Sequence, residues 1–386
     1  MQRYERGNVD QDLVRTILAV VIKLRGIEDA WTVSSPEAYL RARLDDEVGD
    51  EQTIRSFRTL DKARESCLLA YYEFHQYPGQ KAWLRIGRLV RGAYIHGLHQ
   101  LDNRFQRPLY HSNRFIDDDL EEWRYIWWWI FCLDSYSNIT AATPFSVEVE
   151  SIGTALLSTP QSTYGESGTS KPIFLPPEAD NLWRTVKEII SQDKRSSSNL
   201  QIVSQTALRR AASLARLWRL GPSDRLYGQL EILENHISAL RLALPVRYLN
   251  PPREVASNES VSDHHARLVF LLELHVCRLV ITLCLLHKSE SEWLRNWQAS
   301  LEICEDVVLV VKHWDPEYCS SVDPAICLLI LRTLIVIQLH SKQLENSELE
   351  PKVKLSSYQE ILRLFMGHFA TLWNLPNFLI SKGSIL

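Results

Sequence analysis

The chain has 386 residues, of which 45% are hydrophobic, and its formal net charge is −4. This composition indicates a globular protein with a sizeable core, because disordered chains are poor in large apolar residues. The slightly acidic charge is not typical of a domain that binds nucleic acid along the phosphate backbone. Seven cysteines without a C-x-x-C pair favour free thiols in a reducing compartment over disulfides or a zinc cluster.

Apolar residues at three- and four-residue steps predict helices from the start of the chain. The first helix is expected at 10–26, with Asp10 as its N-cap and Gly26 as its end. Its expected apolar side consists of Leu13, Ile17, Val20, Val21 and Leu24. A second helix is expected to start near Pro36, and a third at 54–76 follows an acidic loop at 45–53.

The stretch from Lys81 to Pro144 is the part around which the chain is organised. Its first half predicts an amphipathic helix whose apolar face consists of Trp83, Ile86, Val90, Ala93, Gly97 and Leu98. Gly87 and Gly97 interrupt this pattern, and each glycine costs about 1 kcal/mol relative to alanine inside a helix. We therefore expect a second helix to approach closely at both glycines.

The second half of this stretch follows a polar loop at 102–117 and is apolar on nearly every side from 120 to 136. Such a helix is expected at the centre of a domain. Asp134 follows these apolar residues, and a buried carboxylate needs a partner. We expect an ion pair with Arg88 or Arg91 of the preceding helix.

The remaining sequence predicts more helices and no sheet, because no alternation of period two is sustained. The expected helices begin near 181 and continue at 200–220, 224–243, 264–287, 291–313, 323–345 and 355–374, with loops at 191–199 and 245–262. Residues 158–180 are rich in Ser, Thr, Gly and Pro and predict a flexible crossover. We thus expect an all-α, multi-helix bundle in two packed lobes, 1–157 and 181–386. The apolar run 325–339 is short and broken by Arg332, so a buried helix is expected there and no membrane span.

Three patterns could carry chemistry, and each has a simpler explanation. The acidic segment 117–122 is similar to the aspartate-rich metal motif of terpene cyclases, but carboxylates are also typical of a helix N-terminus. Cys277 and Cys284 lie two helical turns apart, as expected for core thiols. The histidines lie in no recognisable nucleophile motif. We predict no enzyme activity, catalytic residue, cofactor or metal site.

The organising stretch also carries a family resemblance. The first motif, W-x-x-x-G-x-x-x-R-x-A-x-x-x-G-L-H, is matched by Trp83, Gly87, Arg91, Ala93, Gly97, Leu98 and His99. The second is a basic and aromatic segment that ends in W-W-x-x-x-x-x-D, and it is matched by Arg124, Trp127, Trp128 and Asp134. With Pro144 and Phe145 after them, these motifs resemble the regulatory "middle homology" domain of fungal binuclear zinc-cluster transcription factors. The chain departs from the pattern at Ser135, where the family usually has arginine.

The resemblance implies a helical regulator of transcription in the nucleus, with the cytoplasm as a second location. It also implies regulatory proteins as partners, a small-molecule effector and a homodimer as candidates, and a metabolic or secondary-metabolite gene set as target. Without a zinc cluster, no sequence-specific DNA binding by this chain alone is expected. Two alternatives stay open: a metal-dependent enzyme of terpene-cyclase type, and a truncated, non-functional factor whose zinc cluster lies upstream.

Overall fold

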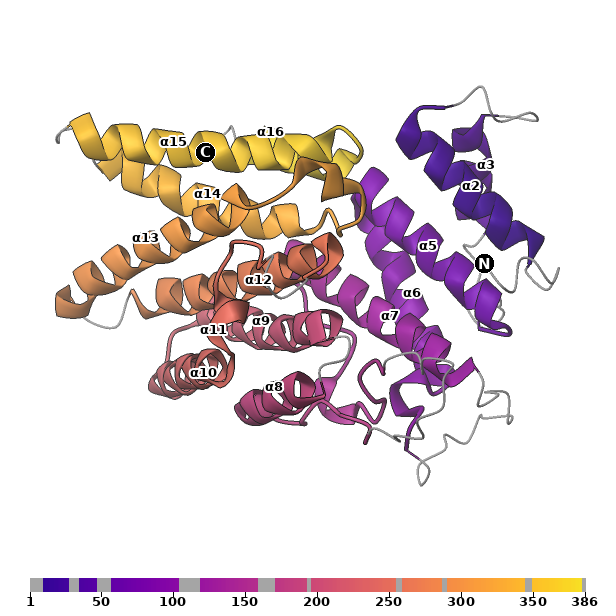
Figure 1. Ribbon diagram of the computed structural model, residues 1–386, viewed down its shortest axis with the longest axis horizontal. Coiled ribbons are helices and arrows are strands. Elements are labelled where there is room, and N and C mark those ends of the chain that lie inside the picture. Colours follow the sequence, from indigo (N-terminus) through magenta and orange to yellow (C-terminus); the bar gives the residue numbers. More distant parts are fainter. Residues whose placement is uncertain are drawn as a thin grey trace. The chain divides into compact units, whose positions relative to one another are not determined.

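The computed structural model describes residues 10–27, 35–46, 57–103, 119–158, 171–192, 196–254, 259–286, 290–343 and 349–383. These residues form helices and irregular connections, with no strand among them, so the predicted all-α class is confirmed (Figure 1). The chain divides into two compact units. The first comprises Met1–Asn138, Phe145–Ala155 and Leu372–Leu375, and the second comprises Ile139–Pro144, Leu156–Thr371 and Pro376–Leu386. The packing of two lobes stays a prediction.

The first unit is built from the N-terminal helices. They are α2 (Gln11–Arg25), α3 (Pro36–Asp46), α5 (Leu60–Gln76), α6 (Gln80–Ile95), the 3-10 turn η2 (Leu98–Gln100) and most of α7 (Leu120–Ala141). Helix α2 packs against α3 and α5, and α5 packs against α6 (Figure 1). One apolar cluster of this unit comprises Ala19, Val20, Leu40, Leu44, Leu69, Tyr72 and Trp373.

A buried carboxylate joins the first three of these helices. Glu65 on α5 is 1% exposed and accepts hydrogen bonds from Arg43 of α3 at 2.6 Å and Thr16 of α2 at 3.0 Å. Lys62, one turn earlier on α5, donates to Glu65 at 3.1 Å and to Asp12 of α2 at 2.9 Å. Because removal of either partner would leave a buried charge, this network favours one packing of the three helices.

The buried side of α2 differs from the predicted one. Leu13 and Val20 are buried, but Ile17 is 43% exposed and Val21 is 49% exposed. The buried stripe passes instead through Thr16 and Ala19, both fully buried. The reason is the hydrogen bond from Thr16 to Glu65, which turns a polar residue inward and the bulky apolar ones outward.

The structure gives the two glycines of the organising stretch different roles. A Cβ atom at Gly87 would meet nothing within 4 Å, so the expected close approach is wrong there. Gly97 lies beyond the end of α6, with φ at 69°, and its amide donates to the carbonyl of Tyr94 at 3.0 Å. Gly97 therefore ends the helix through a left-handed turn, which other residues adopt at a cost.

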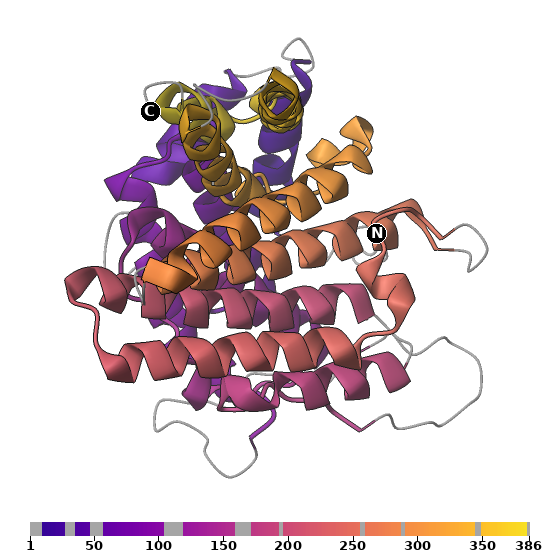
Figure 2. The ribbon, with the colours of Figure 1, turned by 90° about the vertical axis from the view of Figure 1, so that its left-hand side faces the viewer.

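The second unit holds the remaining long helices. They are α8 (Leu182–Ser191), α9 (Ser196–Leu220), α10 (Asp224–Ala243), α12 (Val261–Leu285), α13 (Glu290–Lys312), α14 (Ile326–Gln343) and α15 (Leu349–Ala370). Figure 2 shows α10, α9, α12 and α13, coloured rose to orange, side by side as a stack. Shorter elements are η4 (Val149–Ser151) of the first unit, and η5 (Ala179–Asn181), α11 (Val246–Leu249) and η7 (Pro316–Ser320) of the second.

Helix α12 is the most buried helix of this stack. It is long and apolar enough to cross a membrane, but 89% of its most apolar window is buried inside the fold. Helix α14 also meets the length and composition test, with 56% buried. Glu273 in the middle of α12 is fully buried and accepts hydrogen bonds from Ser204 and Gln205 of α9. Core packing against α9 thus accounts for the apolar composition of α12.

Some predicted boundaries are corrected. Helix α9 begins at Ser196, so the expected loop 191–199 is shorter, and α11 interrupts the expected loop 245–262. Helix α16 (Asn374–Gly383) was not predicted; Pro376 lies in its first turn, where proline is tolerated. Residues 159–170 of the expected crossover lie outside the described residues, and Ile173 and Leu175 after them are buried.

The two glycines give a paired stability prediction. Gly87→Ala is expected to stabilise the protein by about 0.5–1 kcal/mol, because alanine favours the helix and has room for its methyl group. Gly97→Ala is expected to destabilise it by about 1–2 kcal/mol, because φ is positive. Urea unfolding of both variants measures the difference, and equal midpoints would contradict the assignment of the helix end.

Candidate functional site

Several of the residues that carry the family resemblance converge on a segment that is neither helix nor strand apart from the turn η4. This segment, residues 145–155, follows α7 and belongs to the first unit. We call it the return segment. In helices and sheets the backbone amide and carbonyl groups bond to one another, but an irregular segment lacks this pairing. Each of its buried backbone groups therefore needs a hydrogen-bond partner from another part of the protein. The resemblance residues and their neighbours supply many of these partners.

Asp134 holds the beginning of the return segment. Its side chain is fully buried, and its two carboxylate oxygens accept hydrogen bonds from the amide of Ser146 at 3.1 Å and of Val147 at 3.0 Å. The side chain of Asn138, one turn later on α7, donates to the same carboxylate at 2.7 Å. Asp134 thus caps two consecutive backbone amides, as an N-cap carboxylate does at a helix start.

This geometry corrects the expected ion pair. Arg91 is exposed on α6, whereas Asp134 is buried and held by backbone amides and Asn138. Backbone amides satisfy a carboxylate without the desolvation of a second charge, so burial of Asp134 does not require an arginine.

Trp83 reaches the same network from α6. It is 37% exposed, so it is not the core residue that the helical spacing predicted. Its indole Nε1 donates to Asn138 Oδ1 at 3.0 Å, and Asn138 donates in turn to Asp134. The chain of bonds from Trp83 through Asn138 to Asp134 fixes α6 against α7 and fixes which way the Asn138 amide points.

Arg124 and Trp128 hold the end of the return segment. Arg124 on α7 forms a two-pronged ion pair with Asp102, with one of its bonds at 3.0 Å, and Asp102 also accepts from the Ala155 amide at 2.8 Å. Trp128, 2% exposed, donates its indole N–H to the Ala155 carbonyl at 2.9 Å. Burial alone would lower the pKa of Arg124, but its bonds to Asp102 and Glu121 raise it, so the guanidinium stays charged.

The turn after α6 holds the middle of the return segment. The carbonyl of His99 accepts from the Gly153 amide at 2.6 Å, and the Thr154 hydroxyl donates to the Leu98 carbonyl. Gly153 is needed here, because a Cβ atom on it would lie 3.2 Å from the Cβ of Asn103 and closer still to the Gln100 side chain. The ring of His99 lies 4.7 Å from that of Tyr94, whose hydroxyl accepts from the Glu148 amide at 2.9 Å.

Trp127 fills the space between these anchors. It is fully buried, with ring centres 5.9 Å from Tyr94 and 6.5 Å from Trp128. Sequence reasoning missed Asn138, Asp102, Gly153 and Thr154, which complete the network. Only Gly153 left a signal in the sequence, as a glycine directly after Ile152; the others lie in ordinary polar positions that periodicity does not single out.

The acidic segment before α7 is engaged in ion pairs where the structure describes it. Glu121 pairs with Arg124 at 2.9 Å, and Glu122 pairs with Arg64 of α5 at 2.7 Å. Both carboxylates lie in the first turn of α7, where negative charges are favoured by the helix dipole. This position favours the interpretation as charges at a helix N-terminus over that as a metal motif. Asp117 and Asp118 lie outside the described residues.

Two cysteines and two histidines of the second unit are core groups. Cys277 and Cys284 are buried, and burial raises the pKa of their thiols to about 12 and about 11. Burial lowers the pKa of His275 to about 3 and that of His340 to about 4, so both rings are neutral at pH 7. Among the described residues no group of three metal-ligating side chains was found.

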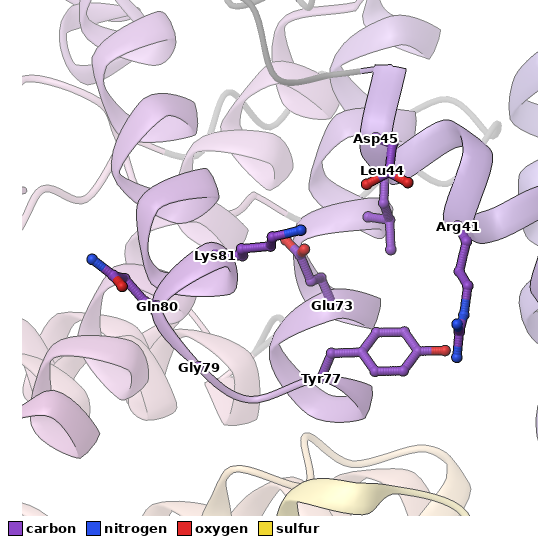
Figure 3. A pocket seen from close by; sticks show the side chains of 8 residues that line it. All are labelled: Arg41, Leu44, Asp45, Glu73, Tyr77, Gly79, Gln80 and Lys81. Carbon is purple, nitrogen blue, oxygen red and sulfur yellow. The ribbon is translucent and has the colours of Figure 1, made fainter.

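The first unit also carries an open pocket of about 480 Å³ (Figure 3). It lies between the last turn of α3, the end of α5 and the start of α6. The side chains relevant to its chemistry are Arg41, Leu44, Asp45, Glu73, Tyr77 and Lys81. None of them belongs to the resemblance motifs, so sequence reasoning gave no signal for this pocket.

Comparison with known proteins gives one match. Residues 33–220 match the family model described as "Fungal specific transcription factor domain". The match runs from just before α3 to the end of α9, and so contains the return segment, all its anchors and the pocket. Neither curated proteins nor solved structures gave a match.

The return segment yields a second prediction. Asp134→Asn is expected to destabilise the protein by about 1.5–3 kcal/mol, because the new NH₂ group faces donors where the carboxylate accepted from them. Arg91→Met is expected to change stability by no more than about 0.5 kcal/mol. Urea unfolding of both single variants and the double variant measures these effects. If Arg91→Met destabilises the protein strongly and this loss disappears in the double variant, Arg91 and Asp134 form an ion pair after all.

Proposed function

Since residues 33–220 match the family model of the fungal specific transcription factor domain, we propose that the chain regulates a gene set in the nucleus through protein partners. The observation that carries the proposal is the match at residues 33–220 together with the network that its signature residues form around the return segment. The targets we propose are metabolic or secondary-metabolite genes, in keeping with regulators of this type.

We propose further that the chain acts without reading DNA itself. The DNA-binding cluster of zinc-cluster factors needs cysteines in C-x-x-C pairs, and the 386 residues contain none. The net charge of −4 also disfavours tight contact with phosphates. The DNA-binding activity would then come from outside these 386 residues.

The proposed mechanism is a shift between conformations of the helical domain. A partner or a small effector that binds one conformation more tightly raises its population by the difference in affinity. The return segment is a candidate for the element that changes, because it is hydrogen-bonded to both α6 and α7, so that a change in its position goes with a change in how these helices pack.

Tethering tests the regulatory role. The chain fused to an unrelated sequence-specific DNA-binding domain is expected to raise or lower a reporter that carries the matching sites, relative to that DNA-binding domain alone. Arg91→Met in the fusion is the control and should leave the effect intact. An unchanged reporter, with the fusion present in the nucleus at equal level, would overturn the proposal.

A binding measurement tests the DNA claim. The purified chain is expected to bind duplex DNA no tighter than about 10⁻⁶ M at physiological salt, and equally well after the sequence is shuffled. Fluorescence anisotropy with labelled duplexes from the promoters of the regulated genes measures both. Nanomolar affinity that is lost on shuffling would show that the chain reads DNA directly.

A further inference from the structure

The pocket of the first unit brings charges of both signs around an apolar floor. Its volume of about 480 Å³ is in the range of sites for small molecules, roughly 300–1,000 Å³. Leu44, 6% exposed, and the half-buried ring of Tyr77 contribute apolar surface. Figure 3 shows Lys81 and Glu73 pointing toward one another beneath Leu44 and Asp45, while Gln80 points away.

Four charged side chains line the pocket: Arg41, Asp45, Glu73 and Lys81. Two of them, Glu73 and Arg41, already have partners of opposite charge within the protein. Glu73 accepts a hydrogen bond from Arg85 at 2.7 Å, with both side chains largely buried. Arg41 donates to Glu37 at 2.7 Å, and Tyr77 donates to the same carboxylate at 3.1 Å. A hydrogen bond from Lys23 is the main cause that lowers the pKa of Glu37 to about 2, so the acceptor stays ionised.

The other two charges have no such partner among the described residues. Asp45 in the last turn of α3 and Lys81 in the first turn of α6 are exposed, and neither has an ion pair or a side-chain hydrogen bond there. They come from different elements on facing sides of one cavity. Among the described residues, the pocket therefore offers one carboxylate and one ammonium group without an ion-pair partner, next to apolar surface.

We propose that this pocket binds a small zwitterion, an α-amino acid with an apolar side chain. Lys81 takes the carboxylate of the ligand and Asp45 its ammonium group, while the apolar side chain lies against Leu44 and Tyr77. A ligand with only an acid or only an amine leaves one of the two protein charges without a partner, and so binds more weakly. Arg41 over the ring of Tyr77, with its carbon 5.6 Å from the ring centre, keeps that ring in place.

The consequence of binding rests on the proposed function, since an occupied pocket would bias the conformation of a transcription regulator. Binding itself does not depend on that function. Titration of the purified chain measures binding, and the tethered reporter measures regulation, so the failure of one is distinguishable from the failure of the other.

The experiment is a calorimetric titration of the full chain with L-phenylalanine and L-leucine. 3-Phenylpropionate, which lacks the amine, and phenethylamine, which lacks the acid, serve as matched probes. We expect the amino acids to bind and the two single-charge probes to bind at least about tenfold more weakly, the effect of one hydrogen bond to a charged group.

Three variants separate the pocket from the rest of the surface. Lys81→Met and Asp45→Asn are each expected to weaken amino-acid binding at least about tenfold without change in unfolding midpoint, because both residues are exposed. Arg91→Met, exposed further along α6, removes a charge outside the pocket and should leave binding unchanged. If neither L-phenylalanine nor L-leucine binds, the proposal is overturned. Equal binding of 3-phenylpropionate would also overturn it, because Asp45 would then have no role.

Discussion

The first unit depends on how the buried carboxylate of Asp134 is satisfied. The amides of Ser146 and Val147 and the amide side chain of Asn138 surround it, so one aspartate on the central helix fixes where the chain returns after α7. A chain without regular structure can be buried only if its polar backbone groups find partners. Asp134 at one end of the return segment and Asp102 with Trp128 at the other supply them.

This constraint gives a physical reason for the family motifs. His99, Arg124, Trp128 and Asp134 lie far apart along the chain, yet each contacts the return segment or holds a group that does. Trp83 is linked to the segment through Asn138 and Asp134. The anchors come from α6, the turn after it and α7, so the return segment cannot move without altering how these elements pack. The proposed regulatory function requires such coupling, because binding at the surface must change the conformation of another part of the domain.

Periodicity in the sequence predicted the helices well, because long apolar stripes such as those of α9 and α12 are strong local signals. It also predicted that Asp134 is buried. It could not predict the partners of Asp134, since the amides of an irregular segment twelve and thirteen residues later carry no sequence signature. For the same reason Trp83 was misread as core and Gly97 as a residue inside the helix. Spacing shows which side of a helix a residue occupies, but not where the helix ends or which polar group lies opposite. The pocket left no signal, because its charges come from three helices.

Hydrogen exchange at the Val147 amide tests the central claim most directly. This amide lies outside any helix, yet it donates to a carboxylate that is fully buried. If the return segment is locked by Asp134, the Val147 amide exchanges only when the first unit opens as a whole, at rates close to those of the buried amides of α7. Exchange at the rate of an unstructured peptide, while the amides of α7 stay protected, would show that Asp134 does not hold the return segment.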